Sequence, residues 1–204
     1  SGNVGTFATT SQGQLPIETL RHSVVTTTIG GTQYLYVIGG DNATTIRSTV
    51  YKATIDSSGN VGTFATTSQG QLPTIHQYHK TVTATIGGTQ YMYVAGGYNG
   101  SIFFSSLYKA TIDSSGNVGT FATTSQAQLP QTKYNHNTVT ATIGGTQYIY
   151  LIGGSISGGN VSTVYKATIG PDTLAAPTST AYSVVTNTDQ LTTGISGNAW
   201  IGDH

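Results

Sequence analysis

The chain has 204 residues, a formal net charge of zero and no cysteine, and charged residues make up only 7% of it. So few cations exclude the basic surface that nucleic-acid-binding proteins use, and no nucleic-acid partner is expected. The lack of cysteine excludes a disulfide framework and thiolate chemistry. No apolar run approaches the roughly 20 residues that a membrane-spanning helix requires.

The chain is organised as an internal repeat with a period of 57 residues. Such repeats are typical of arrays in which similar units stack side by side and bury their apolar faces against one another. The repeat predicts one array over residues 1–169, followed by a linker and a tail, with strand-like stretches, over residues 170–204. Three phrases recur in register: GNVGTFATTSQ from Gly2, Gly59 and Gly116, IGGTQY from Ile29, Ile86 and Ile143, and YKATI from Tyr51, Tyr108 and Tyr165.

The first complete repeat predicts a hairpin of two strands. Residues 23–29 are rich in β-branched residues, which favour strands. A Gly-Gly pair at 30–31 follows, and both of its positions can take the positive φ of a tight hairpin turn. Residues 33–38 form the second strand, whose nearly continuous apolar character predicts burial on both faces.

Two further strands are predicted in the same repeat. Residues 48–55 alternate between apolar and polar side chains, as a third strand does. The run DSSGN at 56–60 predicts a turn, and residues 61–67 are predicted as a fourth strand anchored by Phe64. No stretch has a helical apolar period, so the sequence predicts an all-β fold of four-stranded antiparallel units.

The repeat resembles the kelch repeat. The features that carry the resemblance are the Gly-Gly pair after an aromatic strand (YLYVIGG, YMYVAGG and YIYLIGG), a tyrosine eleven residues later, and an aromatic residue in the outer strand, Phe64 or Phe121. The resemblance covers residues 1 to about 170 and implies β-propeller blades. This chain departs from the kelch pattern in having Phe where the outer strand usually has Trp, and in the longer spacing that the DSSGN turn creates.

The two ends of the array are predicted to be complementary. Residues 2–10 repeat the outer-strand phrase without a preceding unit, and the unit from His136 to Ile169 stops where its fourth strand would begin, near Thr173. An unpaired sheet edge is a template for strand addition. We therefore expect the N-terminal strand to complete the third unit of a second copy, in a closed ring or a filament. The alternatives are a strand supplied by the tail and a fragment of a longer multi-blade surface protein. The assembly residues on this hypothesis are Val4, Thr6, Phe7 and Thr9.

Three histidines stand at equivalent positions before the first strand of each repeat: His22, His79 and His136. In a propeller they would lie around one face of the central channel. A metal site is one interpretation, but no carboxylate recurs at a useful spacing beside them. The favoured interpretation is that each histidine orders its loop through backbone hydrogen bonds, so neither a metal nor another cofactor is expected.

Each loop after the Gly-Gly pair contains an N-x-Ser/Thr triplet, which is an acceptor for N-linked glycans. Such triplets require an exposed loop in a secreted protein. We therefore predict glycosylation of Asn42, Asn99 and Asn160.

These features favour a non-catalytic structural or adhesive protein of the cell surface or extracellular space, assembled as a homo-oligomer or polymer. No catalytic constellation is present, and Glu18 is the only glutamate. The alternative is a glycan-binding module, because aromatic and amide side chains of the loops could stack on sugars and hydrogen-bond them. The residues of that alternative site are Gln77, Tyr78, Tyr98, Asn99, Tyr134 and Asn135.

Overall fold

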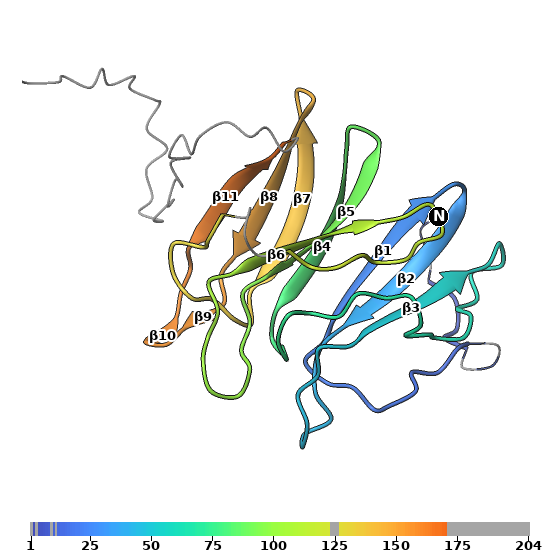
Figure 1. The fold of residues 1–204 in the computed structure, drawn as a ribbon, viewed down its shortest axis with the longest axis horizontal. Helices are drawn as coiled ribbons and strands as arrows, with labels where there is room; N and C mark the ends of the chain where they lie inside the picture. Colours follow the sequence, from blue (N-terminus) through green and yellow to red (C-terminus); the bar gives the residue numbers. More distant parts are fainter. Residues whose placement is uncertain (1, 3, 9, 11, 123–126, 171–204) are drawn as a thin grey trace, which may run out of the picture.

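The computed structural model describes residues 2, 4–8, 10, 12–122 and 127–170. These residues form three three-stranded antiparallel sheets and one short hairpin, with no helix among them (Figure 1). The predicted all-β class is therefore confirmed. The described part of the chain also contains no helix long and apolar enough to cross a membrane.

Each 57-residue repeat supplies one sheet. The first sheet contains β1 (Ser23–Ile29), β2 (Thr32–Ile38) and β3 (Val50–Ile55), and the second contains β4 (Lys80–Ile86), β5 (Thr89–Ala95) and β6 (Leu107–Ile112). The third sheet contains β7 (Asn137–Ile143), β8 (Thr146–Ile152) and β11 (Val164–Ile169), and the extra hairpin of β9 (Ser155–Ile156) and β10 (Gly159–Asn160) lies in its loop. The hairpin at residues 30–31 is confirmed: Gly30 and Gly31 have φ of 56° and 83°, so the turn needs glycine at both positions.

The predicted fourth strand is the main correction. Residues 61–67 pair with β3 through two isolated bridges only, Ile55 with Val61 and Lys52 with Ala65. A ladder needs regular pairing along its length. Between the two bridges this segment adds one backbone hydrogen bond, from the N–H of Gly62 to Thr54 O. The described residues of segment 2–10 form no strand either.

The three sheets lie side by side, with the first and third at opposite ends (Figure 1). Strands β2 and β5 are buried on both faces, as predicted for the second strand. One face of β2 contributes Tyr36 and Ile38 to a core shared with the second sheet, and its other face places Val37 against Phe64. A corresponding core joins the second sheet to the third. The apolar faces are thus buried between successive repeats, which explains why the units stack.

Candidate functional site

An apolar pocket opens at the third sheet. Its cavity volume is only about 20 Å³, and the wider space of about 310 Å³ around it includes open solvent. Its walls come from the loop before β7, from β8 and β11, and from the start of β6. The lining residues are Leu107, Ala127, Leu129, Ile149, Leu151, Tyr165, Lys166 and Ala167.

The repeat shows what fills this place in the other two sheets. Phe121 occupies it in the second sheet, inside a core cluster built by the counterparts of the pocket walls: Val50, Leu72, Met92, Val94, Tyr108 and Ala110. Phe64 occupies it in the first sheet, against Leu15, Leu35, Val37, Tyr51 and Ala53. Both phenylalanines are buried, with exposed fractions of 8% and 5% for Phe64 and Phe121. The pocket of the third sheet is therefore the place of an outer-strand phenylalanine that no described residue supplies.

The neighbouring edge of β11 is also unpaired among the described residues. In the first sheet the backbone N–H of Lys52 donates to Ala65 O and the N–H of Ala65 donates to Lys52 O, both at 2.9 Å. The second sheet repeats this pair between Lys109 and Ala122. No described residue forms the corresponding bridge to Lys166. Pocket and strand edge together form the candidate assembly site.

The N-terminal segment is the complement of this site. The exposed fractions of Val4 and Phe7 are 81% and 92%, the highest among the exposed large hydrophobic side chains. Thr6 is exposed too, whereas Thr9 lies outside the described residues. Burial of a nearly fully exposed phenylalanine side chain in a contact would stabilise that contact by about 2–3 kcal/mol.

The three repeated histidines pack against glycine pairs. A Cβ on Gly39 would lie 2.7 Å from Cε1 of His79, and one on Gly96 would lie 3.1 Å from Cε1 of His136, so each ring covers the glycine pair of the preceding repeat. His79 and His136 have exposed fractions of 0% and 1%, and His22 is only half-buried. Glycine is required where the backbone approaches a ring this closely. The predicted hydrogen bonds of these rings are not found: both ring nitrogens of His79 and of His136 lack a partner among the described residues, so the rings act by packing.

Burial keeps these imidazoles neutral. It lowers the pKa of His79 to about 3, aided by the nearby His76 ring, and lowers the pKa of His136 to about 4. No group of three or more His, Cys, Asp or Glu side chains in the described ranges is arranged to hold a metal ion.

A second buried polar position was missed from the sequence. His76 and Lys133 are equivalent in the repeat, and both are fully buried. His76 stacks on Phe104 with ring centroids 4.2 Å apart, and Lys133 Nζ lies 4.4 Å from the ring centroid of Tyr165. Lys133 also donates to Gly153 O and Thr163 Oγ1, each at 2.8 Å. These hydrogen bonds compensate the burial of its charge and fasten the loops of the third sheet.

The aromatic residues of the alternative glycan site do lie close together, but their rings pack mainly against one another and against Phe103. Phe103 is stacked between Tyr98 and Tyr134, at centroid distances of 4.6 and 4.4 Å, and Tyr78 lies edge-on to Tyr134. Gln77 is buried. Since the ring faces of Phe103 are covered by its neighbours, this aromatic cluster mainly stabilises the loops.

Single backbone hydrogen bonds link the same loops from one repeat to the next. Arg21, Tyr78 and Asn135 hold equivalent positions with φ of 54°, 58° and 54°. The N–H of Tyr78 donates to Arg21 O at 3.0 Å, and the N–H of Asn135 donates to Tyr78 O at 2.9 Å. The positive φ is uncommon for residues other than glycine, and here it directs each loop toward the next repeat.

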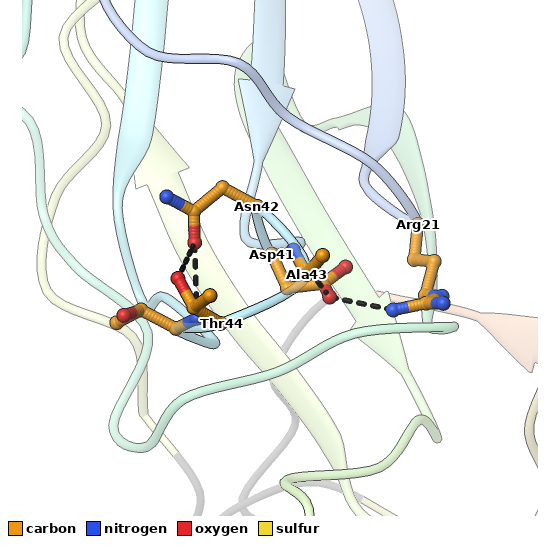
Figure 2. A network of polar contacts seen from close by, with 6 residues as sticks. Arg21, Asp41, Asn42, Ala43 and Thr44 are labelled. Atoms are coloured by element: carbon orange, nitrogen blue, oxygen red, sulfur yellow. Dashed lines mark hydrogen bonds and ion pairs between the residues drawn. The ribbon is translucent and has the colours of Figure 1, made fainter.

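The predicted glycan acceptors all lie in loops or at their edges. Figure 2 shows Asn42 accepting hydrogen bonds through Oδ1, while its amide nitrogen is directed away from these bonds. The loop is held by Asp41, whose Oδ2 accepts from Arg21 Nη1 at 2.6 Å and from the N–H of Ala43 at 3.1 Å (Figure 2). Asn99 forms a similar turn, and Asn160 lies in β10.

Glycosylation remains a prediction for these three positions. We expect peptides that contain Asn42, Asn99 or Asn160 from native material to carry N-linked glycans. Asn42 and Asn99 lie in partly exposed loops, and Asn160 is exposed in the short strand β10. Mass spectrometry before and after enzymatic deglycosylation measures this directly. Unmodified peptides at all three positions would contradict the prediction. Asn117 is the internal control, because it does not begin an N-x-Ser/Thr triplet.

Comparison with known proteins adds no family. No protein-family model matches the chain. No curated protein matches it either.

Proposed function

We propose that this protein is a non-catalytic structural building block that assembles by sharing its N-terminal segment with the third sheet of a neighbouring copy. One observation carries the proposal. The third sheet has an open apolar pocket where the other two sheets hold a phenylalanine, and Phe7, the matching residue of the repeat, is almost fully exposed. The same pocket would also fit the phenylalanine of a further repeat in a longer chain. In that case copies of the chain would not associate through this pocket.

The repeat defines the register of the proposed contact. By analogy with Ala65 on Lys52, Ala8 of one copy pairs with Lys166 of the other. By analogy with Gly62, whose N–H donates to Thr54 O at 2.8 Å, Gly5 donates to Thr168. Phe7 then enters the pocket. Strand addition of this kind combines backbone hydrogen bonds with a pocket for a side chain.

Replacing the exposed phenylalanine tests the proposal. We expect Phe7→Ser to weaken self-association about 30-fold or more, because the apolar burial of one phenylalanine is lost. Sedimentation velocity over a concentration series measures the effect. Deletion of residues 1–10 should abolish association while the far-ultraviolet circular dichroism of the sheets remains.

A matched control replaces another exposed apolar side chain. Ile102 is 56% exposed and lies in a loop of the second repeat, away from the assembly site. We expect Ile102→Ser to leave association unchanged. Self-association of Phe7→Ser equal to that of the unaltered chain would rule out strand sharing through this pocket.

The shape of the assembly follows from the same geometry. We infer that the sheets are blades of a kelch-like β-propeller, as the sequence resemblance implies, and that the fourth strand of the last blade comes from the neighbouring copy. Two copies that reciprocate would close a six-bladed ring, and copies that do not close would form a filament. Negative-stain electron microscopy of the purified chain distinguishes rings from fibres. A surface or extracellular location fits the scarcity of charged residues and the glycan acceptors.

A further inference from the structure

The turn at residues 113–117 is held by a binding surface on the first sheet. Tyr36 donates its hydroxyl to Gly116 O at 2.7 Å, and Lys52 Nζ donates to Ser115 O at 3.0 Å and to Asn117 Oδ1 at 2.6 Å. Lys52 also lies 5.4 Å from the centroid of the Tyr34 ring. We name the three side chains of this surface, one lysine and two tyrosines, the turn receptor.

The same three residue types recur in the second sheet, as Tyr91, Tyr93 and Lys109, and in the third sheet. The turn receptor of the third sheet has no turn on it in the described structure. Its members are Tyr148, Tyr150 and Lys166, two repeats after Tyr34, Tyr36 and Lys52. Lys166 Nζ lies 5.3 Å from the Tyr148 ring centroid, and the two tyrosine rings are 6.2 Å apart, close to the 6.3 Å of the first receptor. The arrangement of the side chains is therefore already formed, while Lys166 is exposed.

The opposite end of the array carries a matching turn without a receptor. Within the turn at residues 56–60, Asp56 Oδ1 accepts from the N–H of Ser58 at 2.9 Å and of Asn60 at 2.8 Å, as Asp113 does in the second turn. Gly116 lies so close to Tyr34 that an added Cβ would be 2.7 Å from its ring, whereas a Cβ on Gly59 would meet nothing within 4 Å.

The asparagines of the two turns show the same difference. Asn117 Oδ1 accepts from Lys52 Nζ and also from Gln69 Nε2 at 3.2 Å. Asn60 Oδ1 accepts from Gln12 Nε2 at 3.0 Å and from no lysine of the described chain. The turn at 56–60 thus has the same shape as its counterpart and retains a lone pair for a lysine.

We propose that the turn receptor of the third sheet, Tyr148, Tyr150 and Lys166, binds the Asp56–Asn60 turn of a second copy of this chain. This inference rests on the proposed self-assembly, but the atoms in this contact differ from those of the shared strand. It implies that the outer face of the third sheet packs on the outer face of the first sheet of the neighbour, as successive sheets pack within the chain. Both contacts then join the same two copies in the same head-to-tail order.

The outer face of the third sheet has the apolar surface that this packing requires. Val139 and Ile152 have exposed fractions of 49% and 45%, whereas their counterparts Val82 and Ala95 have 6% and 0%. Ile143 is 60% exposed. These residues belong to β7 and β8. Both strands lie in the sheet at one end of the array (Figure 1).

The packing of histidines on glycine pairs independently supports a contact between the third sheet and the first sheet of a second copy. His79 covers Gly39 and His136 covers Gly96, so each ring sits on the preceding repeat. A Cβ on Gly153 would meet only Val161 O within 4 Å, at 3.6 Å, and no imidazole. His22, in contrast to His79 and His136, is only half-buried. In the proposed contact His22 covers Gly153 of the neighbouring copy.

Cross-linking between two single-cysteine variants of the full chain tests the inference, since the natural chain has no cysteine. One variant carries Thr168→Cys, on the same strand as Lys166, and the other carries Ser57→Cys, in the free turn. We expect a short bis-maleimide to join them into a heterodimer. The chain with both Thr54→Cys and Ser114→Cys is the benchmark. Thr54 and Ser114 are the repeat equivalents of Thr168 and Ser57, and they lie at the turn contact seen within one chain.

The matched control mixes Thr168→Cys with Ser114→Cys, whose turn is already bound to Lys52. We expect at least tenfold less heterodimer from this mixture. Adding Lys166→Met to the Thr168→Cys chain should lower the yield about tenfold, because hydrogen bonds to a charged group are lost. Circular dichroism of every variant verifies that it is folded.

Equal yields from the two mixtures, or a yield that Lys166→Met leaves unchanged, would overturn the inference. The same result would be expected if residues 171–204 of the same chain covered the third sheet. Strand sharing is judged separately by adding Phe7→Ser to the Ser57→Cys chain. Self-association that Phe7→Ser does not weaken would contradict strand sharing and leave the turn contact standing, if the cross-link still depends on Lys166.

Discussion

Acidification from pH 7 to pH 4 is expected to unfold the protein, and its buried histidines are the reason. Burial lowers the pKa of His79 to about 3 and that of His136 to about 4, from an ordinary value of 6.5. It also lowers the pKa of His76. The folded chain therefore accommodates neutral imidazoles, and protonation favours the unfolded chain, in which the rings are in water.

The direction of the effect follows from proton linkage. The unfolded histidines bind protons as the pH falls below 6.5, while His79 and His136 in the folded chain do not until the pH approaches 3 to 4. The stability is therefore complete above 6.5 and is lost between that value and the lower folded pKa values. Each histidine contributes a loss of about 1.4 kcal/mol per pH unit. Two histidines remove about 6 kcal/mol by pH 4, which is comparable to the whole stability of many domains.

Urea unfolding at a series of pH values between 4 and 8, followed by circular dichroism, measures this loss. His136→Gln should reduce the slope of the free energy of unfolding against pH by about 1.4 kcal/mol per pH unit, even if it lowers the stability at pH 7. His22→Gln is the control, because His22 is half-buried and should contribute less. Asp56 and Asp113 also have lowered pKa values, through hydrogen bonds from Asn60 and Asn117, but their contribution is lost only below about pH 4. A free energy of unfolding that stays constant from pH 6.5 to 4.5 would contradict the explanation.

Gly70→Ala is expected to destabilise the folded chain by about 2–4 kcal/mol. The N–H of Gly70 donates to Val118 O at 2.6 Å, and the N–H of Val118 donates to Gln69 Oε1 at 3.0 Å. A methyl group at position 70 would overlap the carbonyl oxygen of Gly119. Backbone cannot move aside as a flexible side chain does, so these contacts between successive repeats would be broken.

The chain itself carries this substitution once. Gly13 and Gly70 occupy equivalent positions, and in the third repeat Ala127 stands there. On the proposed register the methyl group of Ala127 meets Gly5 of the incoming copy, as a methyl on Gly13 would meet Gly62. The shared strand must therefore shift at this point, which weakens the junction between copies relative to the junctions inside one chain.

We expect Ala127→Gly to tighten self-association about tenfold, because removing the methyl relieves the overlap. The stability of the single chain should change by less than about 1 kcal/mol, since Ala127 is exposed and only the freedom of the unfolded chain increases. Sedimentation velocity and urea unfolding give the two quantities. Association that is unchanged in Ala127→Gly while Gly70→Ala is strongly destabilised would show that the copies do not meet in this register.

Sequence patterns predicted the ladders well and the fourth strand poorly. The first strand was predicted at residues 23–29 and lies there, because β-branched residues and a Gly-Gly turn determine a hairpin locally. The segment after the DSSGN turn has the composition of a strand. Its bridges to β3 involve only Val61 and Ala65, with one further backbone hydrogen bond from Gly62, and composition alone does not predict such irregular pairing.

The candidate sites were predictable in part for a similar reason. The repeat alone indicated that Phe7 lacks a partner and that the third unit lacks an outer strand. It gave no sign that Lys133 is fully buried, since lysine is normally exposed and its partners are backbone and hydroxyl oxygens from distant loops. Tyr78, Tyr98 and Tyr134 of the aromatic cluster were predicted to share a site, whereas Phe103 at the centre of the cluster was missed.

The confinement of every ladder to one repeat has a further consequence for local opening of the molecule. No strand of the described array pairs with a strand of another sheet, so each sheet is connected to the next through side chains and loops. In such quasi-one-dimensional arrays the terminal units have one neighbour instead of two and open first. Amide hydrogen exchange should therefore be slowest in β5 and faster in β1 and β7. Assembly into a closed ring would remove both ends and make the protection of the three sheets nearly equal.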